Sequence, residues 1–204
     1  MSISRKASLF AVSFALLFSG AQSASADAIF DFEANAPNTS TPVTSTVNSL
    51  SATFSGSASV CASDGLFQSL SGNILIQSLV PCGLSTESGP LSISFSSNLT
   101  SVSLNFATAG GTGTLALAAF ENAASAGTAN FTSTLPSGKS NGEGIASFSG
   151  TFNRLTLTSS NLLAIDNVNS ITATSPVPEP ASLATIAVGI GVLAAFARRK
   201  RHIR

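Results

Sequence analysis

The chain contains no tryptophan, no tyrosine and a single histidine among its 204 residues. Without tryptophan or tyrosine it lacks the usual aromatic platforms on which sugar rings stack, and phenylalanine, leucine and isoleucine must fill its core. The one histidine, His202, belongs to a basic tail at the C-terminus. A Ser-His-Asp or Cys-His arrangement is therefore excluded, and we expect no enzymatic activity. A pair of carboxylates acting on a glycosidic bond is the one catalytic alternative left open.

Charge is scarce and unevenly distributed, since charged residues make up 9% of the chain and its formal net charge is zero. Residues 27–174 carry eight acidic side chains but only two basic ones, Lys139 and Arg154, which gives a net charge of −6. The other seven basic residues lie near the two termini. An acidic body without a basic patch argues against binding to nucleic acid or to anionic membrane surfaces.

Only two cysteines are present, Cys61 and Cys82. In an oxidising compartment two cysteines of one secreted domain most often pair, and closing this loop would stabilise the fold by about 3 kcal/mol in the chain-entropy model. Two free buried thiols are the alternative. A metal site at these residues is not expected, because no histidine lies nearby to complete it.

The body, residues 27–174, is close in length to a single domain. Polar and apolar residues alternate along most of it, which is typical of half-buried strands, and no stretch shows a helical apolar stripe. Turn-forming residues predict breaks, including one at Ser97-Asn98 and one at Gly150. This spacing predicts an all-β fold, an antiparallel two-sheet sandwich of jelly-roll type. We expect strands at 29–33, 50–55, 74–80, 91–95, 102–106, 114–120, 129–134, 145–149, 155–157, 162–168 and 170–174.

Three features follow one another at the C-terminus. Pro176, Pro178 and Pro180 favour an extended, stiff segment that exposes Glu179. Residues 181–197 carry no charge, and as a transmembrane helix they would span roughly 25 Å, close to a hydrocarbon core of about 30 Å. A basic cluster follows, which by the positive-inside rule fixes the C-terminus in the cytoplasm. It comprises Arg198, Arg199, Lys200 and Arg201, with Arg204 beyond.

The sequence Val177-Pro178-Glu179-Pro180, followed by the apolar run and the basic cluster, resembles the PEP-CTERM sorting signal of Gram-negative bacteria. A plain single-span anchor is the alternative that the physical properties alone leave open. The resemblance covers residues 175–204, with the motif at 177–182, and implies recognition by a membrane-embedded exosortase that processes the chain near Pro-Glu-Pro. Proteins with this signal usually accompany exopolysaccharide and biofilm systems. The same segment is also labelled the ice-binding protein C-terminal domain, which by itself gives no ground for ice binding.

Residues 1–26 have the parts of a secretory signal peptide. Arg5 and Lys6 form the charged start, residues 7–18 are mostly apolar, and Ala24-Ser25-Ala26 offers a cleavage site. We expect a signal helix, export through the Sec machinery and cleavage after Ala26. Cleavage after Ala28 and an uncleaved anchor are the alternatives. The predicted organisation is therefore a signal peptide (1–26), a β-sandwich body (27–174) and a sorting segment (175–204).

Between residues 91 and 174 five patterns follow one another: Ile93/Phe95, Val102/Leu104/Phe106, Ala119-Phe120-Glu121, Phe152/Leu155/Leu157 and Ala164-Ile165-Asp166-Asn167-Val168. This order resembles a body common among PEP-CTERM proteins, one that looks like a carbohydrate-binding-module sandwich. Such sandwiches often hold a structural calcium near their first and last strands. Asp31 and Glu33 on the first strand, with Asp166 and Asn167 on the last long one, supply the oxygen ligands that Ca²⁺ prefers. The alternative is that Asp31 and Glu33 face solvent while Asp166-Asn167 shapes a turn.

These features predict a non-enzymatic exported protein, held transiently in the inner membrane with its C-terminus in the cytoplasm. After processing by an exosortase it would reach the cell surface or the extracellular matrix and serve within, or bind, an exopolysaccharide. We expect no cofactor. The alternatives are a carbohydrate-binding module, with or without a structural calcium, and a cryptic hydrolase. Nucleic acid is not an expected partner.

Overall fold

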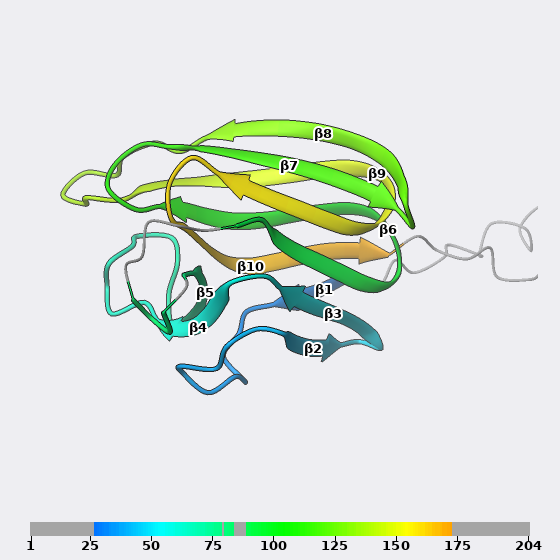
Figure 1. The fold of residues 1–204 in the computed structure, drawn as a ribbon, viewed down its shortest axis with the longest axis horizontal. Helices are drawn as coiled ribbons and strands as arrows, with labels where there is room; N and C mark the ends of the chain where they lie inside the picture. Colours follow the sequence, from blue (N-terminus) through cyan, green and yellow to red (C-terminus); the bar gives the residue numbers. More distant parts are fainter. Residues whose placement is uncertain (1–26, 79, 84–88, 173–204) are drawn as a thin grey trace, which may run out of the picture. The chain divides into compact units, whose positions relative to one another are not determined.

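The computed structural model describes residues 27–78, 80–83 and 89–172. The described residues form ten β-strands and no helix, and every pair of neighbouring strands is antiparallel (Figure 1), as the sequence predicts. The strands are β1 (Asp27–Phe30), β2 (Val43–Val47), β3 (Leu50–Ser55), β4 (Ala58–Ala62), β5 (Asn73–Gln77), β6 (Leu91–Thr108), β7 (Thr114–Glu121), β8 (Ala124–Thr132), β9 (Gly142–Ser159) and β10 (Leu163–Thr172).

No segment of the described chain forms a helix that could cross a bilayer. The expected signal helix (1–26) and the expected transmembrane helix (181–197) both lie outside the described residues.

The register divides the strands into two layers that share β6 and β9. Layer 1 runs β2-β3-β6-β9-β7-β8 and uses the first part of β6 with the second part of β9. Layer 2 runs β4-β5-β10-β6-β9, with β1 also on β10, and uses the other parts of the two shared strands. The two layers are therefore one connected ten-stranded sheet. An antiparallel β body is present, while the jelly-roll form stays a prediction.

The breaks predicted at Ser97-Asn98 and at Gly150 are wrong, because both strands continue through these positions. The register of β6 on β9 shifts between Ser94 and Ser101, and Gly150 has φ +146°. Such bulges bend a strand without ending it. The bends at Ser97-Asn98 and Gly150 therefore carry β6 and β9 from one layer into the other.

The sequence prediction missed β2 and β4 altogether. In β4, Ala58 to Cys61 are all buried, so this strand lacks the polar-apolar alternation that marks a half-buried one. β2 does alternate, but Ser45 takes one of its inward positions and weakens the pattern.

Phenylalanine rings join the two layers in the core, as the absence of tryptophan and tyrosine requires. The ring of Phe30 on β1, in layer 2, lies 6.3 Å from that of Phe54 on β3 and 6.4 Å from that of Phe95 on β6, both in layer 1. Phe32, just after β1, packs edge-on against Phe54 at 4.8 Å. All but Phe95 are at most 2% exposed. Edge-to-face pairs of this kind stabilise by about 1 kcal/mol beyond their buried area.

A smaller apolar cluster lies on the outer face of layer 2. It includes Ala107 of β6 and Ala164 of β10, and it is covered by Phe67 and Leu70 from the segment between β4 and β5. We call this segment, residues 63–72, the cover loop. Cys61 belongs to the same cluster.

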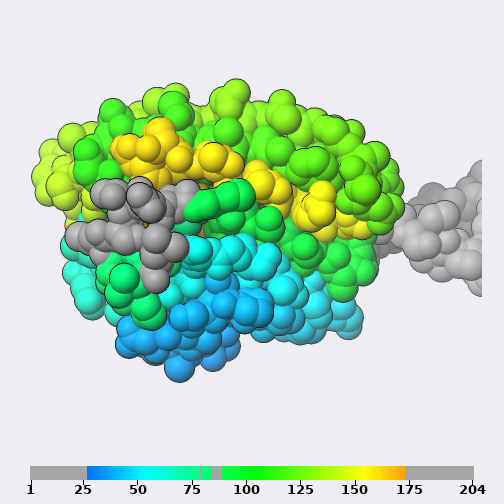
Figure 2. Space-filling view, in the orientation of Figure 1, coloured from blue at the N-terminus to red at the C-terminus, as the bar shows by residue number. Residues whose placement is uncertain are grey.

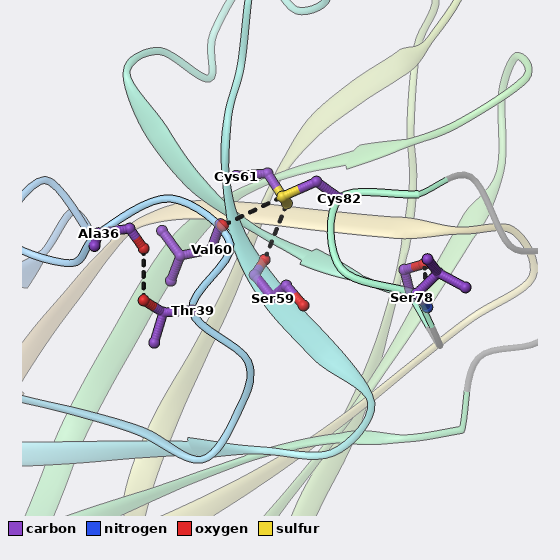
Figure 3. Close-up of a disulfide and its surroundings, with 8 residues drawn as sticks. Ala36, Thr39, Ser59, Val60, Cys61, Ser78 and Cys82 are labelled. Carbon is purple, nitrogen blue, oxygen red and sulfur yellow. Dashed lines mark hydrogen bonds between the residues drawn. A yellow bond between two sulfur atoms is a disulfide. The ribbon is translucent and has the colours of Figure 1, made fainter.

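The predicted disulfide between Cys61 and Cys82 is confirmed, with the two Cα atoms 5.5 Å apart. Figure 3 shows the bridge against the backbone of β4, where the Cys61 Sγ lies 3.5 Å from the Ser59 carbonyl oxygen. The Cys82 Sγ lies 3.4 Å from the carbonyl oxygen of Val60. The bridge closes a loop of chain that contains both the cover loop and β5, so it fixes the two ends of this region.

Candidate functional site

The carboxylate of Glu143, at the start of β9, holds the middle of the cover loop. Its Oε1 accepts the backbone N–H of Gln68 at 2.6 Å, and its Oε2 accepts that of Ser69 at 2.7 Å together with the Ser69 hydroxyl. Burial by itself raises the pKa of Glu143, but these hydrogen bonds and the charge of Lys139 outweigh it, so the pKa lies below its usual range. Glu143 is therefore ionised in the folded protein at neutral pH.

Asp166 on β10 is the second buried acid under this loop, with 1% of its surface exposed. Its Oδ1 accepts the backbone N–H of Asn167 at 2.7 Å, and its Oδ2 accepts the Asn167 amide at 3.0 Å and the Ser71 N–H at 3.4 Å. Burial raises the pKa of Asp166 to about 6, and the charges of Glu33 and Asp31 add to the rise, against the hydrogen bonds from Asn167 and Ser71.

Three of the four residues predicted to bind calcium thus lie close enough to interact electrostatically. However, Glu33 Oε1 accepts the backbone N–H of Asn73 at 3.1 Å, and Asp31 Oδ1 accepts that of Glu33 at 3.3 Å. Asn167, at φ +50° in the β10 bulge, donates its amide to Asp166. In the described part of the chain no group of three or more acidic, histidine or cysteine side chains is arranged to hold a metal ion. The calcium site at these residues therefore stays a prediction.

At the end of the cover loop, the carboxylate of Glu33 packs directly against the backbone of Gly72. Gly72 has φ +65°, and a side chain there would occupy the position of the Glu33 carboxylate. Asn73, which follows, donates its side-chain amide to the Asn35 carbonyl oxygen at 3.0 Å. The turn after β1 and the end of the cover loop therefore fix each other.

Amide and ammonium groups also donate hydrogen bonds to carbonyl oxygens of the cover loop. Lys139 Nζ donates to Gly65 O at 2.6 Å, and Asn105 Nδ2 donates to Ser69 O at 3.3 Å. The loop is thus held from β6, β9, β10 and the segment before β9. Chemically, the buried acids act as acceptors for backbone N–H groups, which is a structural role. Sequence reasoning missed Glu143, because a single acid at a strand end looks like a solvated group.

A cleft of about 310 Å³ opens between the turn after β1 and the edge of β2. Asp31 and Asn35 supply polar groups on one side, Thr44 and Thr46 supply hydroxyls on the other, and Ile29, which is 51% exposed, adds an apolar surface. No aromatic residue other than phenylalanine is available to line it.

The predicted sorting residues lie outside the described residues, and so does the basic cluster. They are Val177, Pro178, Glu179 and Pro180, and Arg198, Arg199, Lys200 and Arg201.

Residues 176–201 match the family model of the PEP-CTERM protein-sorting motif. No curated protein matches the chain. Among solved structures, an isomalto-dextranase of Arthrobacter globiformis T6, complexed with panose, is similar at 14% identity and a TM-score of 0.38. The similarity covers 59% of this chain and 22% of the enzyme, and at this TM-score it carries no argument about function.

Proposed function

The chain carries a PEP-CTERM protein-sorting motif, and from this premise we propose that it is an exported surface or extracellular-matrix protein that an exosortase processes. The match at residues 176–201 is the observation that carries the proposal, because the motif, the apolar run and the basic cluster occur there in order. Export through the Sec machinery delivers the body outside the inner membrane. The tail then holds the chain at that membrane until processing.

The physical roles of the tail follow from its residues. The alternating prolines keep Glu179 in an extended segment, where an enzyme embedded in the membrane can bind the backbone and the carboxylate. The apolar run places this segment at the membrane surface, and the basic cluster prevents the C-terminus from crossing. Glu179 is then the recognition residue, and Pro178 and Pro180 present it.

Replacing Glu179 by Ala should block processing and leave the full-length protein in the inner membrane. Replacing Pro178 and Pro180 together should do the same, while Ser175→Ala, outside the core motif, should be processed normally. Membrane fractionation with an antibody against the body measures the ratio of anchored to released protein. Normal release of the Glu179→Ala variant would refute recognition through this carboxylate.

We further propose that the body has no enzymatic activity and serves within an exopolysaccharide matrix. Two features support the absence of enzymatic activity, and the matrix role rests on the resemblance to PEP-CTERM proteins. Both cysteines are joined in a disulfide, and the buried acids Glu143 and Asp166 are engaged with backbone N–H groups of the cover loop.

A carbohydrate-binding module is the second candidate, and the outer face of layer 1 favours it. The register aligns Ser55, Ser92, Thr156 and Thr128 in one row across this face, with Ala118 between the last two. Hydroxyl groups in a row can hydrogen-bond with successive sugars of a polymer. Retention of the protein on insoluble polysaccharides, measured with and without a chelator, tests this candidate and its calcium. Retention that a chelator abolishes would support both, and no retention on any polysaccharide would leave the matrix role without sugar binding.

A further inference from the structure

A cation, Arg154, lies on the outer face of layer 1. On β9 its side chain lies between those of Ser94 on β6 and Phe120 on β7, and Figure 1 and Figure 2 show β9, in yellow, running between these two green strands. Ser94, Ala116 and Thr158 are exposed on the same face. No described segment therefore covers the surroundings of Arg154.

The guanidinium of Arg154 is held in place but has no polar partner. Its Cζ lies 4.7 Å from the centre of the Phe120 ring, and this cation–π contact fixes the planar group on the sheet. Nε is buried without a hydrogen-bond partner, and within the described residues the two terminal nitrogens have no partner either. Unlike Nε, the terminal nitrogens are not buried, so their N–H groups are available to a ligand.

The other charged groups of the described body do not neutralise this cation. Glu121, at the end of β7, accepts the Asn98 amide at 2.9 Å and forms no ion pair with Arg154. The second basic residue, Lys139, donates to the Gly65 carbonyl oxygen at 2.6 Å. Among the described residues, Arg154 is thus the basic side chain whose hydrogen-bond donors are all free, and an anion from outside the chain can pair with it.

Hydroxyl groups surround the guanidinium on the same face. The register places Thr53 and Ser94 in one row with Arg154, and a second row with Ser92 and Thr156 lies about 7 Å along the strands. A protein interface centres on exposed apolar side chains, whereas hydroxyl groups suit the polar edges of sugars. The large exposed apolar side chains of the described residues all lie elsewhere, and they are Ile29, Leu66, Val80, Leu135 and Ile145.

We propose that this face binds an acidic polysaccharide, and that Arg154 pairs with the carboxylate of a uronic acid unit. The two terminal N–H groups of the guanidinium match the two carboxylate oxygens, which gives a bidentate ion pair. Ser92 and Thr156 then hydrogen-bond with hydroxyl groups of the same sugar or the next one. The inference rests on the sugar binding proposed above for the outer face of layer 1, and it adds the class of sugar.

The net charge of the body, −6, does not oppose such a ligand at this place. Glu143 and Asp166 lie under the cover loop on layer 2, and Asp31 and Glu33 belong to the turn after β1. Exposed charges further apart than about 8 Å are largely screened at about 0.15 M salt. A carboxylate bound among these hydroxyl groups therefore interacts mainly with Arg154.

Polygalacturonate and its fully methyl-esterified form test the proposal, because esterification removes the charge of the carboxyl groups and keeps the sugars. Biolayer interferometry measures binding of the full chain, in detergent, to each immobilised polymer. We expect the wild type to bind polygalacturonate at least about tenfold more tightly than the ester, with a preference that falls as the salt concentration rises. Equal binding to both polymers would overturn the proposal and leave the carbohydrate-binding module intact. Binding to neither polymer would also overturn it, while retention on neutral insoluble polysaccharides decides about the module separately.

Substitutions of Arg154 assign the preference to this side chain. Arg154→Gln should lose it, and Arg154→Lys, which keeps the charge without the planar fork, should keep only part of it. Lys139→Gln changes the net charge equally but lies at the cover loop, so as the matched control it should bind like the wild type. A variant Arg154→Gln that is folded by circular dichroism and keeps the wild-type preference would refute the role of Arg154.

Dextran sulfate distinguishes a carboxylate site from general attraction to polyanions. Tighter binding to dextran sulfate than to polygalacturonate, by both the wild type and Arg154→Lys, would overturn the assignment to a uronic acid. The comparison of the polymers needs only the wild type, so it decides the matter even where a variant does not fold.

Discussion

The two buried acids under the cover loop respond to pH in opposite directions. Glu143 receives three hydrogen bonds, which favour its ionised form, and its pKa falls. Asp166 lies beside two further acids, Asp31 and Glu33, and its weakest bond, from Ser71, is 3.4 Å long. Burial therefore dominates at Asp166, and its pKa rises to about 6. At Glu143 the hydrogen bonds and the charge of Lys139 outweigh the effect of burial, whereas at Asp166 burial is the stronger effect and the charges of Glu33 and Asp31 add to it.

Protonation of Asp166 should stabilise the fold. Its pKa is raised from 3.8 to about 6, so the stability it contributes is complete below pH 3.8 and is lost as the pH rises through about 6. A shift of this size corresponds to about 3 kcal/mol. Asp166→Asn is neutral at every pH, so its free energy of unfolding relative to the wild type should rise by up to about 3 kcal/mol between pH 4 and pH 7.5. Urea denaturation over this range measures the difference.

Glu143→Gln is the matched control for this measurement. Because the pKa of Glu143 is lowered, its contribution is present at neutral pH and lost as the pH falls through its folded pKa. The difference between Glu143→Gln and the wild type should therefore stay constant from neutral pH down to about 4.5 and change, with the opposite sign to Asp166→Asn, only below that pH. Any loss of hydrogen bonds in either variant adds an offset that is the same at every pH. Parallel curves for Asp166→Asn and the wild type would contradict the raised pKa.

At the scale of the strands, the sequence predicted the positions of those strands whose side chains alternate between buried and exposed. Half-buried strands such as β3 and β7 carry that alternation and were placed within a residue or two. The bulge at Gly150 could not be predicted, because a glycine in a strand fits either a break or a bulge and only the partner strand decides. β4 was missed because the cover loop buries its second face, and that burial is a tertiary effect.

For the candidate site, the sequence allowed us to predict which acidic residues lie near one another, but not which groups they contact. The nearness of Asp31 and Glu33 to Asp166 follows from the pairing of the first and last strands, which a sandwich makes plausible. That these carboxylate oxygens accept hydrogen bonds from the backbone of the cover loop could not be predicted. It depends on where the N–H groups of a segment distant in sequence lie in the folded protein. Ser71 and Asn73, which donate to Asp166 and Glu33, gave no signal of that role.

At the scale of the whole molecule, the charge of the chain separates along its length. Residues 27–204 together carry nine acidic and seven basic residues, a net charge of −2, whereas residues 27–180 carry nine and two, a net charge of −7. Five of the basic residues belong to the C-terminal tail. The proposed processing near Pro-Glu-Pro would therefore remove five of these seven basic residues and release an acidic body, whose net charge would favour solubility outside the membrane.

The released form should for this reason focus at a clearly lower pH than the anchored form in isoelectric focusing. The anchored Glu179→Ala variant provides the reference, after allowance for the one acid it has lost. A cut on either side of Glu179 gives a net charge of −6 or −7, so the focusing position together with the mass of the released chain locates the cut. A released form that focuses with the anchored one would still contain Arg198 to Arg201. The cut would then lie beyond the basic cluster, and processing at Pro-Glu-Pro would be refuted.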